Sequence, residues 1–287
     1  MDTRCLQRRE PFGVRRERVS LLIPARNEER NIAWVLRRVP DSVDEVVLID
    51  GRSTDRTVAV ARSIRPDIVV VPEVGRGKGA AVRTGIETAS GTVAVMLDAD
   101  GSMDPGEIDR YLDAVAVGAD LVKGSRFLAG GGTTDMTTVR RLGNRALRDL
   151  VNALYGVRHS ELCYGYMAFR LEPIRRLGLT ADGFEIECEL VVRSLLAGLV
   201  VAEVPSTETP RLSGESNLNA TRDGLRILRT LLWNRVASIG RVMRPGPMRV
   251  PNVAAAATAV GSAAAFLARV DMDAEMDAEE DLEAAVG

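Results

Sequence analysis

The chain has 287 residues, of which 46% are hydrophobic and 27% are charged. This length and composition allow a full hydrophobic core, so they exclude a disordered polymer and a mini-protein. A formal net charge of −2 and an aromatic content of 4% argue against a dedicated nucleic-acid-binding protein. The three cysteines are far apart in the sequence and His159 is the only histidine. These counts argue against a disulfide framework, a clustered zinc site and chemistry built on several histidines.

The charges gather at the two ends of the chain. Residues 1–18 carry six arginines and three acids, whereas residues 271–287 carry eight acids and no base. We therefore expect a basic tail over 1–18, one domain over 19–240, and an Ala-rich segment with a disordered acidic tail over 241–287. No apolar run of signal-peptide type follows the basic start, which predicts a cytoplasmic protein.

One segment of the last part is a candidate for membrane contact. Residues 250–268 are 19 uncharged residues, close to the roughly 20 that span a bilayer. Most of them are Ala, Gly, Ser or Thr, which gain little on entering hydrocarbon. The composition therefore predicts a weak tail helix that touches a membrane and does not span it.

Short apolar runs alternate with helical stretches from residue 19 to about residue 204. Apolar runs of this length without polar alternation are typical of strands that are covered on both faces. The predicted strands are 19–23, 45–49, 68–71 and 93–97, and the predicted helices between them are 28–38, 54–64 and 78–89. This order predicts an α/β fold with right-handed crossovers and a mostly parallel sheet that carries helices on both faces.

The alternation is less regular after residue 100. The Gly/Thr-rich stretch 129–138 is long enough to indicate a functional or mobile loop. The other expected elements are helices near 105–116, 139–155, 185–197 and 219–238, and strands near 119–124 and 200–205.

Polar clusters follow four of the predicted strands. They are Pro24–Glu28, Asp50–Asp55, Asp98–Asp100 and Gly124–Arg126. In an open parallel sheet, ligands bind beyond the carboxyl ends of the strands. Taken alone, Asn27, Ser53 and Asp55 also fit turn residues and helix caps. Four clusters on one rim of the sheet nevertheless predict a ligand site.

Asp98 and Asp100 carry the strongest chemical signal in these clusters. Two carboxylates one residue apart, just after a buried strand, repel one another unless a cation or a shift in protonation relieves them. Oxygen ligands suit Mg²⁺ or Mn²⁺, which also bridges the phosphates of a nucleotide. The structural alternative is a turn with two solvated acids.

The stretch Gly75–Gly79 opens a predicted helix and includes Lys78, one of only two lysines. Backbone amides at a helix start, together with the lysine, are suited to a phosphate or a ribose. The spacing fits neither a P-loop nor the Gly-rich turn of a dinucleotide-binding domain. Those two nucleotide-binding classes are therefore disfavoured.

In this order and spacing, the motifs resemble the family-2 inverting glycosyltransferases of the GT-A fold. The resemblance is greatest to the branch that glycosylates dolichol or polyprenol phosphate, and it runs from about Val19 to Arg235. Its carriers are Ile23–Glu28, Asp50–Asp55, Gly77–Gly85, Asp98–Asp100, Gly124–Arg126 and Gly214–Leu218. It implies a Rossmann-like, mostly parallel sheet that binds a nucleotide sugar.

The resemblance also implies roles for single residues. Asp98 and Ala99 would line the donor, with Asp100, beside Asp98, holding Mg²⁺ or Mn²⁺ against the diphosphate. The residues that would border the nucleotide sugar are Pro24, Arg26, Glu28, Ile49, Asp50, Gly51 and Lys78. Arg126 and Arg211 would meet phosphate groups of donor or acceptor. Two positions depart from the family pattern, because Gly51 stands where many relatives have an acid and Ser102 where some have an amide or imidazole.

The implied reaction moves mannose or glucose from GDP-mannose or UDP-glucose to a polyprenyl or dolichyl phosphate, with inversion at the anomeric carbon. A lipid phosphate is already ionised and needs no general base, whereas a hydroxyl acceptor needs one. The candidate bases are Glu161, Glu185 and Glu187. A soluble hydroxyl acceptor and a non-catalytic nucleotide-sugar binder remain as alternatives.

The last predicted helix has two interpretations. In the first it is an amphipathic strut whose apolar side chains pack inward while its arginines face solvent. Those apolar residues are Leu225, Ile227, Leu228, Leu231, Leu232 and Val236, and those arginines are Arg222, Arg226, Arg229 and Arg235. In the second these arginines, with Arg241, Arg244 and Arg249, lie on an anionic membrane and each contributes about 1 kcal/mol. The second interpretation places the protein peripherally on the inner face of the cell membrane.

Overall fold

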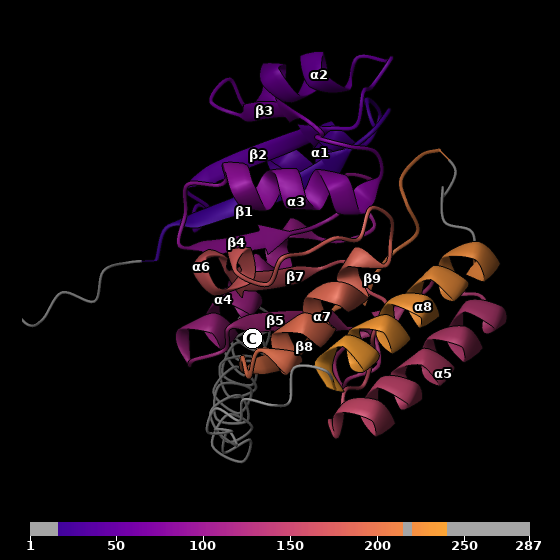
Figure 1. Cartoon of the computed structure of the whole chain (residues 1–287). Helices are drawn as coiled ribbons and strands as arrows, with labels where there is room; N and C mark the ends of the chain where they lie inside the picture. The colour runs from indigo at the N-terminus through magenta and orange to yellow at the C-terminus, as the bar shows by residue number, and fades with distance from the viewer. Residues whose placement is uncertain (1–16, 215–219, 240–287) are drawn as a thin grey trace, which may run out of the picture.

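A seven-stranded sheet forms the centre of the molecule in a computed structural model that describes residues 17–214 and 220–239 (Figure 1). The sheet order is β3-β2-β1-β4-β7-β5-β8. Its strands are β1 (Val19–Ala25), β2 (Glu45–Asp50), β3 (Val69–Pro72), β4 (Val93–Met96), β5 (Leu121–Ser125), β7 (Met167–Arg170) and β8 (Val201–Pro205). Only β7 runs antiparallel to its neighbours, β4 and β5. The prediction of a mostly parallel sheet is confirmed.

Helices cover both faces of this sheet, as the alternation of apolar runs predicted. Their bounds are α1 (Ile32–Arg37), α2 (Thr57–Ile64), α3 (Lys78–Thr88), α4 (Ile108–Ala116), α5 (Thr138–Tyr155), α6 (Leu171–Arg175), α7 (Ile186–Leu196) and α8 (Ala220–Ile239), with a 3₁₀ turn η1 (Pro105–Glu107). Successive residues of β1 point to opposite faces. Leu21 and Ile23 therefore join the core under α1, α2 and α4, whereas Leu22 joins the core under α3, α5, α7 and α8.

Several short elements were not predicted. They are β7, α6 and a two-stranded sheet of β6 (Gly132–Thr133) and β9 (Thr207–Glu208). The expectation that 68–71 is a buried strand is wrong for most of its length, because β3 is an edge strand. Of this run only Ile68 is buried, while Val69 is 36% exposed. Helices α1 and α2 begin later than predicted, since the residues before them form the turns described below.

The inward-packing interpretation of α8 is wrong for most of its apolar residues. Only Ile227 and Leu231, one turn apart, are buried against the α3 and α7 side of the molecule. Leu225, Leu232 and Val236 are exposed, because a helix that packs on one narrow stripe leaves its other faces uncovered. No helix in the described ranges has the length and apolarity needed to cross a membrane.

Parts of the sequence interpretation concern residues outside the described ranges. These are the tail before residue 17, the motif residues 215–218, the arginines at 241, 244 and 249, the segment 250–268 and the acidic tail.

Candidate active site

The loops after β1 and β2 are joined by side chains, and they form one side of the rim. Asn27 adopts a left-handed conformation, with φ of 57°. Its backbone N–H donates to Ser53 Oγ at 3.0 Å, and its Oδ1 accepts from the Thr54 N–H at 2.8 Å. Asp55 Oδ2 accepts from the Glu29 N–H at 3.1 Å. Asn27, Ser53 and Asp55 therefore make the hydrogen bonds expected of turn residues. These hydrogen bonds hold the two loops of the rim together.

Five residues expected to border the nucleotide sugar lie at the ends of β1 and β2. Pro24 and Asp50 are half-buried and Arg26 is exposed, so all three border solvent at the rim. Gly51 lies under Arg26, because a Cβ atom there would be 3.2 Å from the Arg26 Cβ. The Ile49 side chain is fully buried against Gly85 of α3. Ile49 can therefore reach a ligand only through its main chain.

Lys78 links three segments at the centre of the rim. Its Nζ is 2.6 Å from Asp98 Oδ1, after β4, and 2.8 Å from Glu187 Oε1, in α7. A Cβ atom at Gly165 would lie 2.7 Å from Lys78 Nζ and 2.8 Å from Glu187 Oε1, so the absence of a side chain there makes room for the pair. We call Lys78, Asp98, Asp100 and Glu187 the acidic cluster.

The acidic cluster contains three carboxylates and one ammonium group. Although 28% of the Asp98 side chain is exposed, the surrounding protein removes much of its hydration and raises the pKa of Asp98. Asp100 and Glu187 raise it further, and Lys78 opposes them. Burial alone would lower the pKa of Lys78, but the two carboxylates beside it outweigh burial and raise that pKa. The excess of negative charge favours binding of a further cation.

Asp100 is held in a fixed orientation by its own loop. Its Oδ1 accepts from the Ser102 N–H at 3.0 Å and from Ser102 Oγ at 2.7 Å. Ala99, between the two acids, is buried. No three acidic, thiol or imidazole side chains among the described residues form a metal site by themselves. Proteins usually bind Mg²⁺ through one or two carboxylates, and water and substrate phosphate oxygens supply the other ligands. Asp98 and Asp100 would be such a pair of carboxylates.

A segment after β9 closes one side of this loop. The Thr209 N–H donates to the Ser102 carbonyl at 3.0 Å, and the Leu212 N–H donates to the Asp100 carbonyl at 3.1 Å. Arg211 Nη2 thereby comes within 2.8 Å of Glu28 Oε1. Burial raises the pKa of Glu28 and Asp100 adds to this, although Asn31 and Arg211 act in the opposite direction. Glu28 and Arg211, 183 positions apart, thus meet beside the acidic cluster.

Arg126 and Glu161 lie in a separate, buried network. The Arg126 side chain is 3% exposed and its guanidinium is paired with both Glu161 and Glu208. Arg126 Nε donates to Glu161 Oε1 at 2.9 Å, and Nη2 donates to the Cys163 carbonyl at 2.8 Å. Asn144 Nδ2 donates to the same Glu161 oxygen at 3.0 Å. These contacts favour a scaffold role for Arg126 and Glu161. Glu208 and Asn144 were not predicted as partners, because they lie 82 positions from Arg126 and 17 positions from Glu161.

The three candidate bases have different surroundings. Glu187 contacts Lys78, Glu161 is enclosed by Arg126 and Asn144, and Glu185 Oε1 accepts from the Gly183 N–H at 3.1 Å just before α7. Only Glu187 of the three therefore belongs to the acidic cluster.

The glycines at the start of α3 serve a different purpose from the one expected. The Gly79 N–H donates to the Asp182 carbonyl at 2.9 Å. A Cβ atom at Gly77 would lie 2.4 Å from the Asp182 carbonyl oxygen, and one at Gly79 would lie 2.3 Å from that of Ala181. These glycines thus permit close approach of the 181–183 segment, and the Gly79 amide is not directed at a phosphate.

The fold and the rim place this chain among α/β proteins that bind ligands beyond the carboxyl ends of a parallel sheet. The family model described as glycosyl transferase family 2 matches residues 20–178. The chain is 36% identical over 209 residues to "Glycosyltransferase AglJ" of Haloferax volcanii, covering 72% of this chain and 68% of that protein. It is 33% identical to "Polyprenol monophosphomannose synthase" of Mycolicibacterium smegmatis, covering 74% and 85%.

A solved structure also resembles this one. Glucosyl-3-phosphoglycerate synthase from Mycobacterium tuberculosis, in complex with Mn²⁺, UDP and its product, superposes with a TM-score of 0.61. The identity is 22%, and the match covers 77% of this chain and 80% of that one. That similarity supports the GT-A fold. The chain belongs to glycosyl transferase family 2, as the motif resemblance predicted.

Proposed function

We propose that this glycosyltransferase moves a hexose from a nucleotide diphosphate sugar to a polyprenyl phosphate at a membrane surface. The observation that carries the proposal is the acidic cluster at the carboxyl ends of the sheet, where Lys78 contacts Asp98 and Glu187. The name of the M. smegmatis relative supports a polyprenol-linked acceptor.

Asp98 and Asp100 are the residues that would hold Mg²⁺ or Mn²⁺. Such an ion supplies Lewis-acid stabilisation of the charge that develops on the leaving diphosphate. Ser102 fixes the Asp100 carboxylate, so little reorganisation of that side chain is required. Lys78 orients Asp98 and adds a second positive charge near the same position.

The nucleotide end of the donor would lie along the loops after β1 and β2. Arg26 and Asp50 border solvent there, and the main chain of Ile49 and Gly51 completes that edge. Glu28 is placed by Asn31 and Arg211, with Asn31 Nδ2 donating to Glu28 Oε2 at 2.5 Å. These loops are cross-linked, which pre-organises the binding edge.

The acceptor phosphate would meet Arg211, whose guanidinium lies on the rim. An ionised phosphate attacks the anomeric carbon without transfer of a proton to the enzyme. If the acceptor were a soluble hydroxyl compound, Glu187 is the candidate base within the acidic cluster. It would have to exchange its contact with Lys78 for one with the acceptor.

The test is transfer of radiolabelled sugar from GDP-mannose and from UDP-glucose, each with Mg²⁺ or Mn²⁺, to a short-chain polyprenyl phosphate. We expect metal-dependent label in the organic phase with one donor. Label that appears only in the aqueous phase, on a hydroxyl acceptor, would contradict the lipid-phosphate acceptor while keeping the enzyme class.

A further inference from the structure

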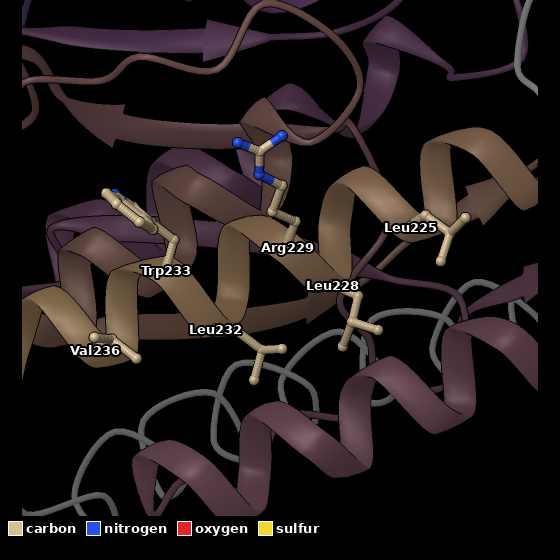
Figure 2. A pocket seen from close by; sticks show the side chains of 6 residues that line it. All are labelled: Leu225, Leu228, Arg229, Leu232, Trp233 and Val236. Atoms are coloured by element: carbon tan, nitrogen blue, oxygen red, sulfur yellow. The ribbon is translucent and has the colours of Figure 1, made fainter.

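Apolar side chains line α8, with Leu225, Leu228, Leu232 and Val236 on one side and Trp233 beside Arg229 on the other (Figure 2). Leu225, Leu228, Leu232, Trp233 and Val236 line an open hollow there with Arg229, and we call the five apolar residues the α8 ridge. Leu225 is 63% exposed, Trp233 70% and Val236 65%. Their spacing of three to four residues keeps the leucines and the valine on one face. Exposed apolar side chains gathered in this way indicate a binding surface.

The charges that border the α8 ridge are positive. Asp223 is buried, and it lies within ion-pair distance of Arg222 at 3.4 Å and of Arg226 at 3.9 Å. The exposed charges described on the helix therefore come from arginines. Exposed leucine and tryptophan side chains with arginines beside them are typical of a helix that lies in the interface of an anionic membrane.

Arg226 connects α8 with a segment that leads to the acidic cluster. Arg226 Nη1 is 3.3 Å from the position that a Gly183 Cβ would occupy. The neighbouring Asp182 carbonyl accepts from the Gly79 N–H at the start of α3, next to Lys78. The segment 182–183 thus lies between Arg226 of α8 and the start of α3.

We propose that the α8 ridge inserts into the headgroup region of a bilayer that contains anionic phospholipid, with the flanking arginines on lipid phosphates. This inference deepens the proposed function by naming the surface that meets the membrane, and it rests on that function for the identity of the acceptor. A second copy of the chain on the same face would bring arginine-rich surfaces together, so charge complementarity favours the anionic bilayer.

The test is cosedimentation of the full chain with vesicles of phosphatidylcholine, alone or mixed equally with phosphatidylglycerol. The variant L232Q/V236Q removes two exposed apolar side chains. The matched control is V117Q, since Val117 is 59% exposed at the end of α4, on the other face of the sheet. We expect wild type and V117Q to bind the anionic vesicles equally, and L232Q/V236Q to bind at least about tenfold more weakly.

Equal binding by L232Q/V236Q, or no binding by wild type, would overturn the proposal. Two further results would also overturn the proposal, because each would show that something other than a membrane covers the α8 ridge. One is a dimer in sedimentation velocity that L232Q/V236Q dissociates. The other is a vesicle-free monomer in which Trp233 fluorescence is already blue-shifted and shielded from acrylamide, which would show that another part of the chain covers the ridge.

Transfer assays separate this proposal from the proposed function. With a water-soluble short-chain polyprenyl phosphate, L232Q/V236Q should keep wild-type turnover within about twofold, whereas transfer to acceptor embedded in vesicles should fall with binding. If wild type binds vesicles through the ridge but glycosylates no lipid phosphate, the proposed function fails and the membrane surface stands.

Discussion

Arg126 offers a sharp test of how the site is supported. Its side chain is 3% exposed, and its guanidinium is paired with Glu161 and Glu208 and lies 4.6 Å from the centre of the Tyr164 ring. Replacing Arg126 by alanine leaves two buried carboxylates without their partner. Breaking a buried ion pair from one side costs about 3–5 kcal/mol. For a domain of this size, roughly 2–4 °C per kcal/mol predicts a fall in Tm on the order of 10 °C.

The assay is urea unfolding at pH 7 followed by circular dichroism, with R176A as the control. Arg176 and Glu172 form an ion pair between side chains that are 77% and 67% exposed. The R176A variant should therefore change the free energy of unfolding by less than about 0.5 kcal/mol. An R126A variant within about 1 kcal/mol of wild type would refute the scaffold argument. A normally stable R126A variant with a raised KM for the acceptor would restore the phosphate-binding role expected from the sequence.

Two further predictions concern the acidic cluster and Gly79 in the first turn of α3. Because burial, Asp100 and Glu187 raise the pKa of Asp98, a reaction that needs this carboxylate should lose activity on the acid side at a higher pH than an ordinary aspartate would give. The acid limb of kcat/KM should move to higher pH in K78M and to lower pH in E187Q, and a limb that moves in neither variant would contradict this assignment. The G79A variant should lose about 3 kcal/mol of stability, because its Cβ would meet the Ala181 carbonyl oxygen at 2.3 Å. The control is G143A in α5, where nothing lies within 4 Å of the new Cβ. There the higher helix propensity of alanine should raise the free energy of unfolding by about 0.5–1 kcal/mol. Equal free energies of unfolding of G79A and G143A in urea would contradict the packing argument.

The strands that carry the rim were predictable because they are buried. The runs that became β1, β2 and β4 are apolar at nearly every position, and this is the pattern of strands covered on both faces. Strand β7 has only four residues and pairs antiparallel between β4 and β5. Its antiparallel direction leaves no periodic signal in the sequence.

The side-chain partners within the site were less predictable than the strands. The sequence indicated Asp98 and Asp100 because they are adjacent to a buried strand, and it indicated Lys78 from its glycine-rich context. The contact of Lys78 with Glu187 joins positions 109 apart, and only the packing of α7 beside α3 creates it. The apolar periodicity of α8 did not show which of its apolar residues would be buried. Burial is limited to the narrow stripe formed by Ile227 and Leu231.

The acidic cluster is the proposed site of sugar transfer. The decisive measurement is Mn²⁺-dependent transfer of labelled sugar into polyprenyl phosphate by wild type, D100N and D104N. Asp104 is a matched control, since its Oδ1 only accepts from the Gly106 N–H at the start of η1, and asparagine also suits that cap. We expect D100N to lower kcat/KM by about 100-fold or more while D104N stays near wild type. Equal activity of the three proteins would contradict the assignment of the acidic cluster as the catalytic centre.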